Sequence, residues 1–110
     1  MHGRHLLIAA CLALGGPAAL ALEGDAEAAQ AKVSMCMGCH GIPGYRTAFP
    51  EVYPVPKLGG QHAAYLVRAL QAYRDGERSH PTMRAIAASL SEQDMADLAA
   101  YYSAAGGETQ

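Results

Sequence analysis

The sequence predicts an all-α fold in one small domain. Two segments of the 110-residue chain, around residues 66–73 and 95–102, repeat apolar residues at helical spacing. A third segment, before residue 40, is rich in alanine, whereas residues 41–60 are dense in glycine and proline. No segment alternates apolar and polar residues well enough to predict a strand. Three helices joined by loops therefore account for the chain.

The first helix is expected over residues 25–39. Asp25 is a favoured N-cap residue, the acidic Glu27 follows it early, and Lys32 comes later. The glycines and prolines of residues 41–60 then predict a loop, because proline lacks the backbone N–H that a helix or central strand needs. A loop of this length in a small domain commonly wraps something.

Two further helices complete the expected fold. The first covers residues 61–75, with Leu66, Leu70 and Tyr73 on one stripe and Gly76 as its C-terminal stop. The second begins at Ser91, where Asp94 forms a weak capping box. Its inner face consists of Met95, Leu98 and Tyr102. Gly106 and Gly107 mark its expected end.

Cys36, Cys39 and His40 form a C-x-x-C-H motif at the end of the first predicted helix. Residues three and four apart share a helical face, so the two thiols and the imidazole project together. This is the attachment motif of a c-type haem, in which two thioether bonds anchor the porphyrin and the histidine binds the iron. The sequence therefore predicts one haem c, covalently bound through Cys36 and Cys39, with His40 as an axial ligand.

Other uses of a cysteine pair stay open at this point but explain less. A zinc site needs a fourth ligand, and neither His62 nor His80 has a paired knuckle spacing. A dithiol oxidoreductase carries its motif at a helix start after a strand, and no strand pattern precedes Cys36. A plain disulfide would close a tiny loop and stabilise little.

Met83 is the candidate for the second axial ligand. It follows His80 and Pro81 in a polar connection that could bring a side chain to the far side of the iron. Met35 and Met37 sit beside the cysteines, and Met95 fits the stripe of the last helix. His80 and His62 are the rival ligands, each with a solvated or capping role as the simpler interpretation. A methionine in general is more often core filler.

The choice of ligand separates two classes of function. Histidine and methionine together fill both axial positions, which favours one-electron transfer and leaves no place for a substrate. An iron with an open or displaceable position would instead indicate a haem enzyme or a gas sensor. We expect the first class, and therefore no enzymatic activity.

Residues 1–21 are predicted to be a secretory signal peptide, which leaves residues 22–110 as the domain. Arg4 and His5 precede an apolar run that is broken by Gly15, Gly16 and Pro17 and reaches an A-x-A cleavage site at Ala21. The run is too short and interrupted to predict a membrane span, although an uncleaved anchor stays open. We expect a periplasmic protein with no membrane span after cleavage. A net charge of −2 makes a nucleic-acid partner improbable.

The chain resembles the class I c-type cytochromes, both the short bacterial periplasmic members with one haem and single domains of members with two. The resemblance is carried by residues 36–41 (CMGCHG), 56–61 (PKLGGQ), 65–66 with 70–76 (LQAYRDG), 83–87 (MRAIA) and 90–102. It implies the cytochrome c fold, with three main helices around the haem. It also implies that the Pro56 carbonyl accepts the His40 Nδ1 proton, and that Tyr101 or Tyr102 packs over alanines of the first helix.

The resemblance further implies a periplasmic electron carrier that meets donor and acceptor proteins through its haem edge. The alternative within this class is the haem c subunit of a larger complex, for example with a flavin dehydrogenase; a terminal oxidase is another expected partner. Residues 45–55 have no counterpart in the family pattern. None of the arginines and lysines is assigned to a haem propionate, since most exposed cations only solvate a surface.

Overall fold

The computed structural model describes residues 21–49 and 51–104. The predicted signal peptide and the expected stop at Gly106 and Gly107 therefore lie outside the described residues, apart from Ala21. Within the described part of the chain, no helix combines the length and apolarity needed to cross a membrane.

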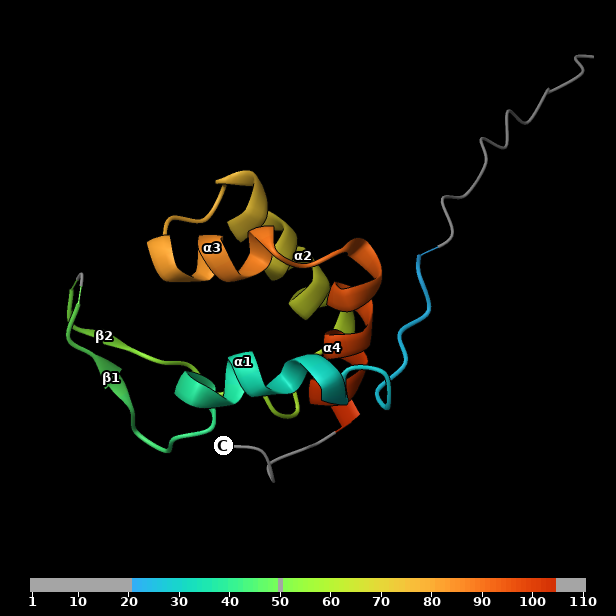
Figure 1. Cartoon of the computed structure of the whole chain (residues 1–110), viewed down its shortest axis with the longest axis horizontal. Helices are drawn as coiled ribbons and strands as arrows, with labels where there is room; N and C mark the ends of the chain where they lie inside the picture. Colours follow the sequence, from blue (N-terminus) through green and yellow to red (C-terminus); the bar gives the residue numbers. More distant parts are fainter. Residues whose placement is uncertain (1–20, 50, 105–110) are drawn as a thin grey trace, which may run out of the picture.

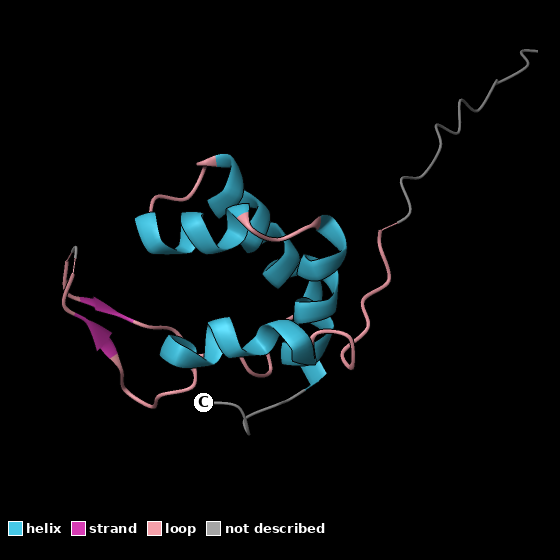
Figure 2. Cartoon of the chain, in the orientation of Figure 1, coloured by secondary structure: helices cyan, strands magenta, loops and turns pink. Residues whose placement is uncertain are grey.

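Four helices and one small hairpin make up the described chain, as Figures 1 and 2 show. The all-α prediction is confirmed, but a fourth helix and the hairpin were not predicted. In chain order the elements are α1 (Gln30–His40), β1 (Arg46–Thr47), β2 (Tyr53–Pro54), α2 (Ala63–Asp75), α3 (Pro81–Ala88) and α4 (Glu92–Ala104). The two strands pair antiparallel, with Arg46 opposite Pro54 and Thr47 opposite Tyr53.

Asp25 caps the turn before α1 and not α1 itself, whose N-cap residue, Ala29, makes no side-chain cap hydrogen bond. Asp25 Oδ1 accepts hydrogen bonds from the backbone N–H groups of Glu27 and Ala28, at 2.9 and 3.2 Å. A turn over residues 25–29 leads into α1, whose regular part begins at Gln30 rather than at the cap. The helix continues through His40, one residue beyond the expected end, so that the whole cysteine–histidine motif is helical.

Glycine ends α2 and a capping box begins α4, both as expected. Gly76 adopts the left-handed conformation, with φ 82°, and its N–H donates to the Tyr73 carbonyl, which ends α2. At the start of α4, Ser91 N–H donates to Asp94 Oδ2 (2.8 Å) and Asp94 N–H donates to Ser91 Oγ (3.0 Å). Asp94 also pairs with Lys32 Nζ at 3.3 Å, which links α4 to α1.

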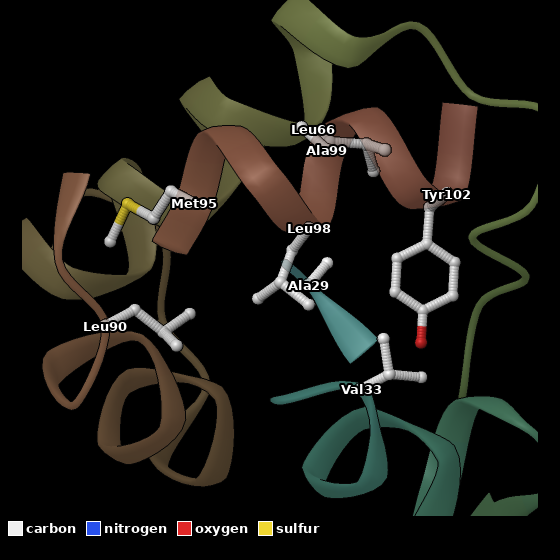
Figure 3. Packing of buried hydrophobic residues seen from close by; sticks show 8 residues of the cluster. All are labelled: Ala29, Val33, Leu66, Leu90, Met95, Leu98, Ala99 and Tyr102. Carbon is white, nitrogen blue, oxygen red and sulfur yellow. The ribbon is translucent and has the colours of Figure 1, made fainter. Parts of the chain in front are cut away.

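The core lies where α1, α2 and Leu90, which follows α3, pack against α4, the most buried helix (Figure 3). Met95 is fully buried there, and Tyr102 points from α4 toward Val33 of α1. The buried hydrophobic cluster consists of Ala29, Val33, Leu66, Leu90, Met95, Leu98, Ala99 and Tyr102. Of the residues expected to pack an aromatic over the first helix, Tyr102 and Ala29 both belong to this cluster, whereas Ala28 and Ala31 are exposed.

The segment before α1 is bound closely to α4. A Cβ on Gly24 would lie 2.1 Å from the Ala96 carbonyl oxygen, so only glycine allows this approach. Asp97, which is 8% exposed, accepts hydrogen bonds from Asp25 N–H and Gln93 Nε2, both at 2.8 Å. The buried Asp97 carboxylate therefore holds the segment before α1 against α4. No motif in the sequence predicted this contact.

Candidate haem site

One cavity of about 280 Å³ lies inside the fold and opens to solvent. Its wall draws on all four helices and on the hairpin. α1 and α3, which both contribute to this wall, are separate helices that lie apart in Figure 1. The apolar part of the wall comes mainly from α2 and α4 and includes Leu66, Ala69, Leu70, Leu98 and Ala99. A largely apolar cavity with few polar groups is typical of a cofactor site.

α1 brings Cys36, Cys39 and His40 to one wall of this cavity. Both thiols are half-buried and free, so they are not joined in a disulfide. Burial raises the pKa of the Cys36 thiol, which disfavours the thiolate that a dithiol oxidoreductase needs. Among the described residues, no three His, Cys, Asp or Glu side chains gather closely enough to hold a metal ion.

His40 is oriented by the loop that follows it. Its Nδ1 lies 2.7 Å from the Pro56 carbonyl oxygen, which can only accept, so Nδ1 donates its proton. A neutral imidazole carries one N–H, and therefore Nε2 keeps a free lone pair. Partners of this kind set the ring orientation and the basicity of a histidine ligand. This is the contact that the family resemblance implied for Pro56.

Met83 lies in the first turn of α3, where it is half-buried and lines the same cavity as His40. The expectation that it sits in an irregular connection was wrong. Pro81 occupies the first turn of α3, a position where its missing N–H has no helical partner to lose. Proline thus starts this helix, although the sequence interpretation treated it as a sign of a loop.

The rival ligands are placed less favourably. Met95 is fully buried in the core, and His62 is exposed; neither lines the cavity. Met35 does line the cavity, but from α1, the helix that carries His40. His80 also lines it, yet its Nδ1 accepts the Met83 N–H, which places the ring proton on Nε2. His40 and Met83 remain the imidazole and thioether that face the cavity from different helices.

Polar residues line part of the cavity wall. Thr47 and Tyr53 come from the hairpin, whereas Lys57 and Arg78 are the two cations of the lining. An apolar wall with two thiols, an imidazole and a thioether matches an iron porphyrin with two vinyl groups, and the cations suit its carboxylates. Thr47 and Tyr53 belong to residues 45–55, whose contribution sequence reasoning missed, because two-residue strands leave no alternating pattern.

Comparison with known proteins agrees with this geometry. The family model described as Cytochrome c matches residues 26–104. The chain belongs to the cytochrome c family. Covalently bound haem c is therefore its cofactor, and Cys36 and Cys39 have the spacing of the attachment motif.

Several bacterial cytochromes are similar to this cytochrome c chain. It is 40% identical to cytochrome c4 of Pseudomonas aeruginosa over 97 residues, which cover 88% of this chain and 46% of the relative. It is 45% identical to cytochrome c-554(548) of Halomonas halodenitrificans over 83 residues, covering 73% of this chain and 95% of that protein. The chain thus spans about half the length of the cytochrome c4 relatives and nearly all of the shorter one.

A solved structure supports the fold. The cytochrome c4 of Acidithiobacillus ferrooxidans matches with a TM-score of 0.51 and 36% sequence identity, over 64% of this chain and 42% of that chain. The match shows the same all-α cytochrome c fold.

Proposed function

We propose that this cytochrome c is a periplasmic one-electron carrier whose haem c is attached through Cys36 and Cys39 and whose iron lies between His40 and Met83. The observation that carries the proposal is the placement of an imidazole and a thioether on different helices that face one cavity. The similar proteins that are named cytochromes support the same function.

The haem supplies the redox-active iron, and the chain's residues set its properties. The Met83 thioether is a soft donor that stabilises the ferrous state, so it would raise the reduction potential relative to two histidines. Pro56 holds His40 in one orientation and tautomer. Two protein ligands and two thioether anchors would restrict movement at the iron and fill its coordination positions, which would suit electron transfer and give no site for a substrate.

The partners are proposed to be redox proteins, one donating and one accepting. A relative from Stutzerimonas stutzeri that is 35% identical over 98 residues is named a thiosulfate dehydrogenase electron acceptor. A dehydrogenase, including a flavin enzyme, or a terminal oxidase therefore suits this chain as a partner. Contacts of this kind are small and transient. The alternative, a haem c subunit in a lasting complex, predicts co-migration with a larger protein when native extracts are separated by size.

The ligand assignment is tested by replacing Met83 with alanine in the haem-loaded protein. The parent should show the long-wavelength ferric absorption that reports sulfur ligation and should change little when carbon monoxide is added to its reduced form. Met83→Ala should lose that absorption and bind carbon monoxide, because one axial position becomes open.

Met35→Ala is the matched comparison, since Met35 is the other methionine of the described cavity wall. It should keep the absorption of the parent. Loss of sulfur ligation in Met35→Ala but not in Met83→Ala would reverse the assignment. A parent protein that binds carbon monoxide readily would favour the second class of function, a haem enzyme or gas sensor.

A further inference from the structure

His80 caps the helix that carries Met83. It occupies the N-cap position of α3 in an extended conformation, and its Nδ1 accepts a hydrogen bond from the Met83 N–H at 3.3 Å. The next residue, Pro81, has no N–H of its own. The bond therefore fixes the backbone of Met83 itself within the first turn of α3.

The His80 ring is in turn held by aromatic residues from two other elements. Tyr53 of β2 meets it edge-on, with ring centroids 5.2 Å apart and planes at 73°. Tyr73 of α2 meets it at 6.4 Å and 82°, and the Arg78 guanidinium lies 4.7 Å from the Tyr73 ring centre. Such edge-to-face contacts favour particular ring orientations. The contacts with the hairpin and α2 thus favour the ring orientation in which His80 Nδ1 faces the Met83 N–H.

We propose that His80 is a positioning residue for Met83, and that its cap hydrogen bond keeps the thioether directed at the iron. This inference rests on the proposed function, in which Met83 is the axial ligand. His80 acts here as an acceptor: its Nδ1 lone pair is used by the Met83 N–H, and Nε2 carries the ring proton. The same bond that positions Met83 therefore makes His80 itself unsuited to bind the iron.

The cap matters because the ligand lies in the first turn of a short helix. α3 has eight residues, and only Ala87 among them is buried. The free N–H groups of a first turn are held only by caps or water, so a helix that loses its cap frays at this end. Fraying at residues 81–83 would move the Met83 side chain directly, and the population with the thioether away from the iron would increase.

The experiment compares three variants of the haem-loaded protein. His80→Ala removes the acceptor, and His80→Asn replaces it with another favoured N-cap side chain. His62→Ala is the matched control, because His62 holds the N-cap position of α2 but makes no side-chain cap bond and does not line the cavity. Each variant is titrated in the ferric state with free imidazole, which competes with the thioether, and its sulfur-to-iron absorption is recorded.

His80→Ala should bind imidazole about fivefold more tightly than the parent, which corresponds to ~1 kcal/mol and matches the loss of one N-cap. Its sulfur-to-iron absorption should decrease in parallel. His80→Asn and His62→Ala should both stay within about twofold of the parent. The asparagine result remains informative even if the alanine variant folds poorly.

Two outcomes would overturn the proposal. Imidazole affinity of His80→Ala within about twofold of the parent would show that the cap does not hold Met83. Failure of His80→Asn to restore the parent affinity would show that the acceptor is not what matters. Failure of the proposed function looks different, because Met83→Ala would then leave the parent spectrum and imidazole affinity unchanged.

Discussion

Preventing haem attachment should abolish the cooperative fold. The perturbation is the double substitution Cys36→Ser and Cys39→Ser, which removes both anchoring sulfurs at a small cost in volume. Without the haem, the side chains around the cavity of about 280 Å³ lose their packing partner. At about 24 cal/mol per Å³, an unfilled cavity of this size would cost up to ~7 kcal/mol. The figure is an upper value, because the cavity opens to solvent.

That cost is comparable with the whole stability of a small domain, which is about 5–15 kcal/mol. The rest of the core cannot compensate, since the buried cluster draws on only one or two residues from α1, α2 and the segment after α3. The serine variant should therefore retain part of its helical signal but lose a cooperative transition.

Far-UV circular dichroism during urea unfolding measures this directly. The haem-loaded parent should show one sharp transition and the serine variant a broad, shallow loss of signal. Ser34→Ala, at an exposed position of the same helix, is the control and should behave as the parent. A cooperative transition of the serine variant within about 2 kcal/mol of the parent would refute the reasoning, because the cavity would then contribute little to stability.

Two further predictions concern the helix contacts that hold the site in place. Asp97→Ala should lower the free energy of unfolding by about 1 kcal/mol, because it removes the acceptor of the partly buried Asp25 N–H; urea unfolding checks this, and Asp97→Asn should recover part of the loss. For Asp94, the hydrogen bond from the Ser91 backbone N–H lowers the carboxyl pKa below its ordinary value. Its contribution to stability is therefore complete above this value and is lost as the pH falls through the lower pKa of the folded state. Urea midpoints measured at acid pH should fall less steeply in Asp94→Asn than in the parent, and equal slopes would contradict the assignment.

Local signals in the sequence predicted much of the fold. Gly76 ends α2, Ser91 caps α4 and Asp25 caps the turn before α1, because each of these contacts involves residues only two or three positions away. The stripe that contains Leu98 and Tyr102 is buried as its spacing indicates. These predictions needed no knowledge of how the helices pack.

Features that depend on distant partners were missed. α3 was interpreted as an irregular connection because Pro81 indicated a loop, yet proline at the first turn of a helix and a cap from His80 allow the helix to form. The hairpin was not predicted, because each of its strands has only two residues, too few to show an alternating apolar and polar pattern. Asp97 gives no sign in the sequence that its carboxylate will be buried under the segment before α1.

By itself, the sequence determined that two thiols and an imidazole project from one helical face, because the spacing of Cys36, Cys39 and His40 within a single helix decides it. Only the tertiary structure decided that the Met83 thioether lines the same cavity as His40 from a different helix. Residues 40 and 83 are brought together by the packing of α2 against α3 and α4, and by the contact of Tyr53 with His80. Such a long-range arrangement depends on the burial of many side chains at once, and no short motif encodes it.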